Sequence, residues 1–165
     1  MFRMISLLTT ALLISAGNAE PNAESNCPTT PKLEVVAAIA PAAGTYPVWV
    51  VDGSYGYWRG PEAFIKTAWI LARDNPGDLI VTARKLDGDG RALFRSSLTA
   101  DLSDRLVISH ADSQQMIPGG IEPDELRQYS FRSSAIMYPS AGCWELMVQY
   151  GKSESRIIVE LNDLP

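Results

Sequence analysis

The residue that limits catalytic chemistry in this chain is its one histidine, His110. A serine hydrolase of the usual kind needs a histidine base, a serine nucleophile and an acid that orients the histidine. Asp112 is the nearby acid, and the candidate nucleophiles are Ser54, Ser109 and Ser113. Ser54 lacks the glycine two positions earlier that a nucleophile elbow uses. We interpret His110 as a solvated loop residue and predict no catalytic residue.

Metal ligands are equally scarce in the sequence. A zinc site takes three or four histidine, cysteine or carboxylate ligands, whereas the chain has one histidine and two cysteines. Asp87-Gly88-Asp89-Gly90 matches the start of a calcium loop, but the next acidic ligand and the closing glutamate are missing. Its two glycines favour a tight hairpin turn. We therefore expect no metal site and no cofactor.

Two pairs of carboxylates have the composition that glycoside hydrolysis requires, since that chemistry needs two acids flanking one bond. They are Glu122 with Asp124, and Asp101 with Asp104. Charged turns that keep a loop soluble have the same composition, and we prefer this interpretation for both pairs. Residues 109–128 as a whole indicate a long surface loop, a kind of segment that often carries function.

The best candidate for a binding site is an aromatic loop. Tyr55, Tyr57, Trp58 and Arg59 lie in a segment that glycines and a proline punctuate, which is typical of a loop. Rings that project outward beside a guanidinium form an amphipathic platform for a sugar ring or a protein partner. Rings that fold back would instead cap one end of the core. Both alternatives stay open, and these four residues are the predicted binding site.

The first residues are typical of a secretory signal peptide. Arg3 precedes a mostly apolar run from Ile5 to Ala16, and Gly17-Asn18-Ala19 is a small-residue cleavage pattern. This run is shorter than the ~20 residues that cross a bilayer, and no later segment reaches that length. We expect removal of residues 1–19, a secreted or periplasmic protein, and no membrane span.

Charge excludes one class of partner. The sequence has a net charge of −5, and removal of the signal peptide takes away a further positive charge. No cluster of lysine and arginine reverses this sign locally. An acidic surface repels phosphate groups, so we expect neither nucleic acid nor an anionic lipid surface as a partner.

Two cysteines, Cys27 and Cys143, follow the signal peptide. Export implies an oxidising compartment, where a single bridge between them is the simplest arrangement. Alternatively, Cys27 could be the lipidated first residue of a lipoprotein. The preceding Glu24-Ser25-Asn26 does not form the small apolar box of such a site.

The order of segments indicates a β-protein. Residues 20–32 are rich in proline, asparagine, serine and threonine, and indicate an extended N-terminal arm. Short β-branched or aromatic runs then alternate with glycine, proline and aspartate, as in a sandwich. Trp49, Trp69 and Trp144 are expected in the core. The candidate strands are residues 33–40, 46–51, 67–72, 79–86, 91–94, 105–109, 130–137, 143–150 and 155–161.

Alternation places particular side chains on each face of the last strands. Trp144, Leu146 and Val148 share the core face, whereas Cys143 points the other way. A bridge from this cysteine should therefore fasten the arm outside the main core. We expect hairpins joining 143–150 to 155–161 and 79–86 to 91–94. Residues 123–127 should form one helical turn, because a proline and acids begin it.

Several motifs occur here in the order of an uncharacterised family of exported bacterial proteins, which the chain resembles. They are Cys27-Pro28-Thr29-Thr30, Trp69, Ala83-Arg84-Lys85-Leu86-Asp87, and Tyr138-Pro139-Ser140-Ala141-Gly142-Cys143-Trp144-Glu145-Leu146 before a final Ile/Val strand. The resemblance implies an immunoglobulin-like sandwich, bridged cysteines and export, and it implies no activity. The chain departs from true immunoglobulin domains, because Ala141 occupies the tyrosine-corner position.

Together these observations predict an all-β domain over residues 33–165, a two-layer immunoglobulin-like β-sandwich of seven to nine strands with a disulfide-anchored N-terminal arm. The expected function is an exported, non-catalytic binding or structural module of the bacterial cell envelope, with an unknown protein or cell-envelope component as partner. The alternative is a carbohydrate-binding or carbohydrate-cleaving domain that uses the aromatic loop.

Overall fold

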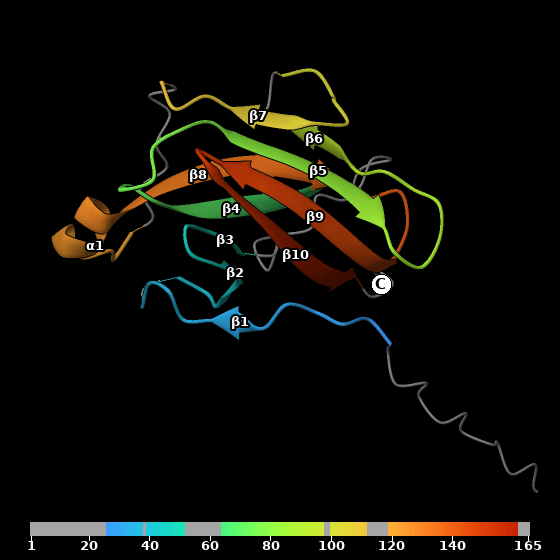
Figure 1. Cartoon of the computed structure of the whole chain (residues 1–165), viewed down its shortest axis with the longest axis horizontal. Helices are drawn as coiled ribbons and strands as arrows, with labels where there is room; N and C mark the ends of the chain where they lie inside the picture. The colour runs from blue at the N-terminus through green and yellow to red at the C-terminus, as the bar shows by residue number, and fades with distance from the viewer. Residues whose placement is uncertain (1–25, 38, 52–63, 98–99, 112–118, 162–165) are drawn as a thin grey trace, which may run out of the picture.

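The computed structural model describes residues 26–37, 39–51, 64–97, 100–111 and 119–161. Within these residues, ten strands and one short helix form two antiparallel sheets that pack face to face (Figure 1). The predicted all-β, two-layer architecture is confirmed at this level. The strand count exceeds the predicted seven to nine because the short strand β2 (Ala42–Thr45) was not among the predicted strands.

The larger sheet has six strands in the order β1-β2-β3-β4-β8-β6. Their bounds are β1 (Lys32–Leu33), β2 (Ala42–Thr45), β3 (Val48–Val51), β4 (Phe64–Ala72), β8 (Tyr129–Met137) and β6 (Leu93–Arg95). The smaller sheet has four strands in the order β10-β9-β5-β7. Their bounds are β10 (Ser153–Leu161), β9 (Gly142–Tyr150), β5 (Leu79–Lys85) and β7 (Leu106–Ile108).

The main core lies between the two sheets, where alternate residues of every long strand meet. Trp69 of β4 and Trp144 of β9 are both fully buried there. The indole N–H of Trp69 donates to the Ser134 hydroxyl at 2.9 Å, and that of Trp144 donates to the Ser140 carbonyl at 3.1 Å. Both polar groups are thus satisfied, so the rings contribute their large apolar area to the core without an unpaired donor. The predicted core positions of Trp69 and Trp144 are confirmed here, and Trp49 is also buried, in a second core.

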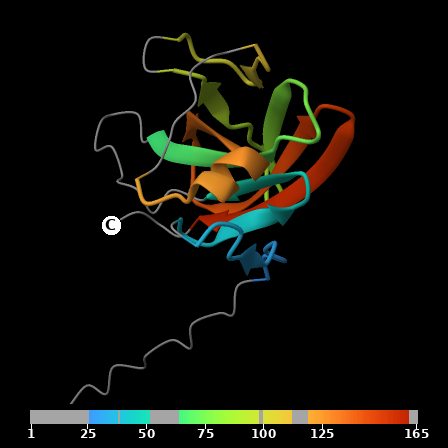
Figure 2. The same cartoon turned by 90° about the vertical axis from the view of Figure 1, so that its left-hand side faces the viewer.

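A second, smaller core lies on the outer face of the six-stranded sheet. Val36 and Ile39 from the segment after β1 pack there with Ile70 and Phe131 of β4 and β8. The helix α1 (Pro123–Gln128) adds Leu126 to this cluster and faces the viewer in Figure 2. The predicted helical turn is confirmed, and a reciprocal capping box satisfies its first donors. Among the described residues, no helix is long and apolar enough to span a membrane.

One predicted strand was wrong and one strand was missed in the same region. Residues 33–40 were expected to be a strand, but among the described residues of this range only Leu33, the end of β1, is paired. The strand that completes the sheet is β2, whose alanines and glycine have low strand propensity. At Gly44, with φ +135°, a Cβ atom would lie 2.6 Å from the Val48 carbonyl oxygen. Close packing rather than propensity therefore determines this strand.

The predicted hairpin of residues 79–86 and 91–94 is correct at its turn and wrong beyond it. The Lys85 N–H donates to the Gly90 carbonyl at 3.0 Å, and Arg84 and Arg91 form an isolated bridge. After Ala92 the chain leaves β5 and crosses to the other sheet, where β6 pairs with β8. The glycines of residues 87–90 were sufficient to predict the turn from the sequence. The change of sheet after the turn depends on tertiary packing. The predicted hairpin of β9 and β10 is confirmed along its whole length.

Both lateral edges of the sandwich are closed by short backbone contacts. On one side the N-terminal arm passes β10, where Thr30 and Ile158 exchange hydrogen bonds of 2.9 and 2.8 Å. The arm then pairs with β2 as strand β1, which runs below β2 and β10 in Figure 1. On the other side, Phe94 and Ser103 exchange backbone hydrogen bonds of 2.7 and 3.1 Å. Each sheet is thus linked to the other at both edges.

Candidate functional site

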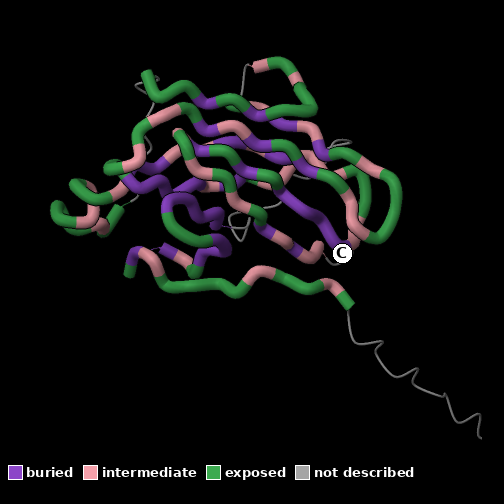
Figure 3. The backbone as a smooth tube through the Cα atoms, in the orientation of Figure 1, coloured by how far each residue is buried: buried purple, intermediate pink, exposed green. Residues whose placement is uncertain are grey.

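In the described part of the chain, the second core covers the outer face of the six-stranded sheet but not that of the four-stranded sheet. Buried and exposed residues alternate along its strands in Figure 3, because one face of the sheet packs on the core. On an outer face we expect polar side chains that water solvates fully. The side chains that alternation places on this face are Ile80, Thr82, Arg84, Val107, Cys143, Glu145, Met147, Gln149, Glu154, Arg156, Ile158 and Glu160.

Glu145 is the exception on this face, because it is only 1% exposed. Its Oε2 accepts a hydrogen bond from the Arg84 Nε, and its Oε1 contacts the Arg156 Nε. Arg84 lies directly opposite on β5, and Arg156 lies diagonally across on β10. Each carboxylate oxygen therefore has its own guanidinium partner, which offsets the cost of burying the charge. We call these three residues the arginine–glutamate cluster.

The two guanidinium groups remain largely accessible. Their side chains are 62% and 61% exposed, whereas the Glu145 side chain is 2% exposed. Both arginines use Nε toward Glu145, which leaves the Nη N–H groups of Arg84 and Arg156 as further donors. No other described residue engages these Nη groups in a hydrogen bond or ion pair. The cluster as a whole carries one net positive charge.

An apolar surface lies beside the cluster. Met147 follows Glu145 by two residues on β9, so it lies on the same face, and it is 56% exposed. In register it lies between Thr82 of β5 and Arg156 of β10. Val107 on β7 is 49% exposed and extends the apolar surface toward the edge of the sheet. Exposed methionine is adaptable because its side chain is unbranched and polarizable.

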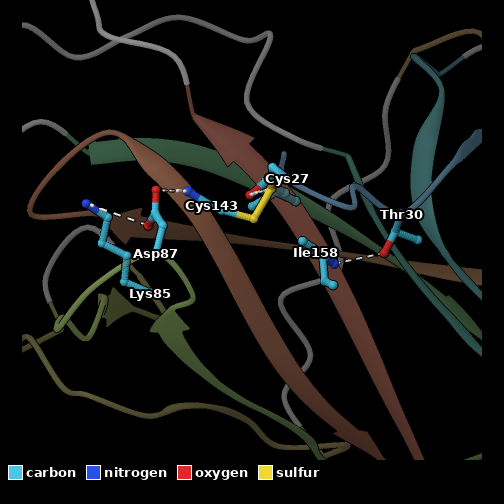
Figure 4. The surroundings of a disulfide bond; sticks show 7 residues. Cys27, Thr30, Lys85, Asp87, Cys143 and Ile158 are labelled. Carbon is cyan, nitrogen blue, oxygen red and sulfur yellow. Dashed lines mark hydrogen bonds and ion pairs between the residues drawn. A yellow bond between two sulfur atoms is a disulfide. The ribbon is translucent and has the colours of Figure 1, made fainter. Parts of the chain in front are cut away.

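The disulfide closes one end of this face (Figure 4). Cys27 and Cys143 are bonded with their Cα atoms 5.5 Å apart, which confirms the predicted bridge. Cys143 points away from the main core, as alternation predicted, and the arm lies on the outside. The Cys143 N–H donates to the Asp87 carboxylate at 3.2 Å, and the Lys85 ammonium lies 3.8 Å from the same side chain.

The position of Asp87 also bears on the partial calcium motif. Its carboxylate is turned toward β9 and Lys85 rather than toward the turn's own backbone. Among the described residues, no group of three histidine, cysteine or carboxylate side chains is arranged to hold a metal ion. The expected absence of a metal site stays a prediction.

The predicted binding residues Tyr55, Tyr57, Trp58 and Arg59 lie outside the described residues. Their role in binding, and the carbohydrate alternative that uses them, stay predictions. Ser54, Asp112 and Ser113, from the hypothetical hydrolase set, lie outside the described residues as well.

His110 is described, and it is exposed on the surface. Its backbone N–H donates to the Asp78 carboxylate at 2.8 Å. The neighbouring Ser109 hydroxyl accepts from the Ala111 N–H at 3.3 Å, an interaction typical of a turn. These contacts fit the interpretation of His110 as a loop residue.

The candidate acid pairs have partners in the fold. Asp124 forms an ion pair with Arg127 within α1, and Glu122 belongs to the capping box of that helix. Asp104 lies 3.6 Å from the guanidinium of Arg91. These contacts support the interpretation of the acids as turn and helix-end residues.

Sequence reasoning missed the arginine–glutamate cluster. Alternation placed Glu145 on the solvent side of β9, which is correct for its direction but wrong for its exposure. The register of the last hairpin could have predicted one of the two contacts of Glu145. With the short Gly151–Lys152 turn, β10 brings Arg156 to the position diagonal to Glu145. The Arg84 contact depends on the pairing of β5 with β9, which no short-range pattern specifies.

Comparison with protein-family models, curated proteins and solved structures finds no match to this chain.

Proposed function

We propose that this protein is an exported, non-catalytic binding module of the bacterial cell envelope with an immunoglobulin-like sandwich. We further propose that it binds a protein partner through the outer face of its four-stranded sheet. Membership of the exported family that the sequence resembles is part of the same proposal. The bridge between Cys27 and Cys143 supports an oxidising compartment, because such bonds persist there and are rare in the cytosol.

The observation that carries the proposal is the combination of buried Glu145, two accessible guanidinium groups and exposed Met147 on one face of the sheet. Stability alone is a weak reason for this arrangement, because buried ion pairs often contribute little net stability compared with apolar residues. Arginine and methionine are enriched at protein interfaces, and fixed arginines are frequent binding hot spots. The face thus has the composition of a contact surface.

A site-specific photocrosslinking experiment tests the proposed face. A photoreactive phenylalanine analogue replaces Met147 in one strain of the native host and Asp89 in a control strain. Asp89 is exposed in the turn after β5, away from the face. Irradiation should give a discrete crosslinked adduct from position 147 and none from position 89. A third strain carries the analogue at Tyr57. Adducts from position 57 with none from 147 would place the contact on the aromatic loop and refute the sheet face.

A further inference from the structure

We infer that the arginine–glutamate cluster is a receptor for one carboxylate group, carried by an extended peptide segment of a protein partner whose neighbouring side chains are apolar. This inference rests on the proposed binding function and names the chemistry of its partner.

The two guanidinium groups are held in place by Glu145. Glu145 is 1% exposed and engages the Nε of Arg84 and the Nε of Arg156 with its two oxygens. A guanidinium fixed at Nε has lost much of its rotational freedom, while its Nη groups can still donate to an acceptor. An arriving carboxylate would therefore meet donors that are already ordered, which lowers the entropic cost of binding.

The charges on this face limit how much negative charge a ligand of the cluster can carry. The cluster has one excess positive charge, which a single carboxylate neutralises. Glu154 and Glu160 lie on the same face of β10, on either side of the cluster, and the chain has a net charge of −5. A multiply charged ligand such as a phosphate polymer would be repelled by these acids. A ligand with one carboxylate in an otherwise apolar segment is attracted by the two arginines and is little repelled by Glu154 and Glu160.

Apolar side chains share the face with the cluster. Met147 is 56% exposed next to Glu145, and Val107 is 49% exposed on the strand at the edge. Ile80 and Ile158 on the same face are partly buried. A peptide that places its carboxylate on the guanidinium groups would extend apolar side chains over these residues and bury their area. The face therefore favours an acidic residue between aliphatic ones.

The test is a titration of the purified full-length mature protein with two matched peptides, acetyl-Leu-Glu-Leu-amide and acetyl-Leu-Gln-Leu-amide, followed by NMR. We expect the glutamate peptide to shift the Nε–Hε signals of Arg84 and Arg156 and the methyl signal of Met147 in a saturable manner. The glutamine peptide should bind at least about tenfold more weakly, because a charge-assisted hydrogen bond is lost. Equal binding of the two peptides, or no saturable shift, would overturn the inference.

Substitutions distinguish binding at the cluster from attraction by any positive charge of the protein. Arg84→Gln and Arg156→Gln should each weaken the glutamate peptide at least about fivefold, and Arg156→Lys should restore only part of the affinity, because lysine lacks the planar fork. Lys66→Gln is the matched control, since Lys66 is exposed on β4 of the six-stranded sheet and therefore lies outside the face. Thermal melting confirms that each variant is folded. An equal loss in Lys66→Gln would show non-specific attraction and contradict the inference.

Two further measurements distinguish a carboxylate receptor from a general anion site and from a binding face without such a receptor. Inorganic phosphate should displace the glutamate peptide poorly, and efficient displacement would show a general anion site instead of a carboxylate receptor. The photocrosslinking at Met147 reports on the proposed function separately. Adducts at that position without peptide binding would leave the sheet face as an interface and overturn only the carboxylate inference.

Discussion

Glu145 shows how one side chain can contradict its position in a pattern. Its place on β9 directs it toward solvent, yet Arg84 and Arg156 leave it only 1% exposed. Removal of the carboxylate and removal of the arginines should lower the free energy of unfolding by different amounts, because the arginines are mostly accessible to water and the carboxylate is not. Removal of the carboxylate leaves two cations that water can solvate, whereas removal of both arginines leaves a buried anion without a partner.

The first prediction uses this asymmetry. Glu145→Met should lower the free energy of unfolding by less than about 1.5 kcal/mol, because methionine fills the same space without a charge. The double substitution Arg84→Gln with Arg156→Gln should cost roughly 3 kcal/mol, because the buried carboxylate then lacks its cations. Urea denaturation measures both values. A larger cost for Glu145→Met than for the double variant would contradict this account.

The second prediction concerns Tyr150 at high pH. The phenol is 3% exposed and donates to the Ala72 carbonyl at 3.1 Å. Burial raises the pKa of Tyr150 above its ordinary value of 10.0, while a hydrogen bond with Ser130 and nearby arginines oppose the rise. The folded state therefore prefers the neutral phenol. Its contribution to stability is complete below about pH 10 and is lost as the pH rises through the raised pKa.

Tyr150→Phe should be less stable by about 1 kcal/mol at pH 8, because a buried hydrogen bond is removed. Between pH 10 and pH 11.5, roughly the range in which phenols ionise, its stability should fall less steeply than that of the parent protein. Denaturation curves at several pH values provide the comparison. Parallel loss of stability in the two proteins would show that Tyr150 does not contribute to the alkaline transition.

At the scale of elements, the N-terminal arm joins the two sheets. The bridge between Cys27 and Cys143 anchors the arm on the outer face of β9, and Thr30 then bonds the edge of β10. Strand β1 finally pairs with β2 of the other sheet. A segment with no core of its own thus connects the first part of the chain to the last hairpin. Its contribution depends on contacts far apart in the sequence.

The third prediction is that this anchor provides much of the stability. Replacement of both cysteines by serine should lower the free energy of unfolding by roughly 4 kcal/mol, since the bridge spans 116 residues. The same loss should follow reduction of the parent protein. Denaturation with and without reductant measures it. A loss below about 1 kcal/mol would show that the arm stays bound without its covalent anchor.

The fourth prediction concerns coupling within the arm. Thr30→Val should cost about 1 kcal/mol in the bridged protein, because the Ile158 N–H loses its hydroxyl acceptor. In the protein without cysteines the same change should cost much less, because the arm has already detached. A double-mutant cycle measures this coupling. Equal costs in the two backgrounds would show that the arm binds β10 independently of the bridge.

For the whole molecule, the prediction from sequence was best where the alternation of apolar residues along a strand agrees with the way the strand pairs. The alternation around Trp144 predicted β9, its core face and the outward direction of Cys143, because one residue step exchanges the two faces of a strand. The hairpin with β10 followed from a short turn. These features are local, so no knowledge of the other sheet was needed.

The parts that could not be predicted depend on packing between distant segments. Strand β2 consists of small residues that favour no element, and it forms because β3 and β10 leave room only for a backbone without large side chains. Strand β6 leaves its hairpin partner for the other sheet. The arginine–glutamate cluster needs the register of three strands at once, so its members lie at unremarkable positions in the sequence.

The fifth prediction concerns the protein in its native compartment. Intact protein isolated from the host should lack residues 1–19 and should resist alkylation of Cys27 and Cys143 until a reductant is added. Mass spectrometry of alkylated protein, with and without reductant, provides the measurement. Two freely alkylated thiols, or a retained N-terminal segment, would contradict the proposed export.

The bridge has a consequence for synthesis. A ribosome delivers Cys27 long before Cys143, which follows 116 positions later in the second-last strand. The first thiol must therefore wait until strands β1 to β8 have been made, and the sequence between Cys27 and Cys143 offers it no other cysteine. A product that stalls before Cys143 would keep a reactive sulfhydryl at Cys27 and could couple only to another molecule. Closure of this covalent ring thus marks a chain that has been made at least as far as β9.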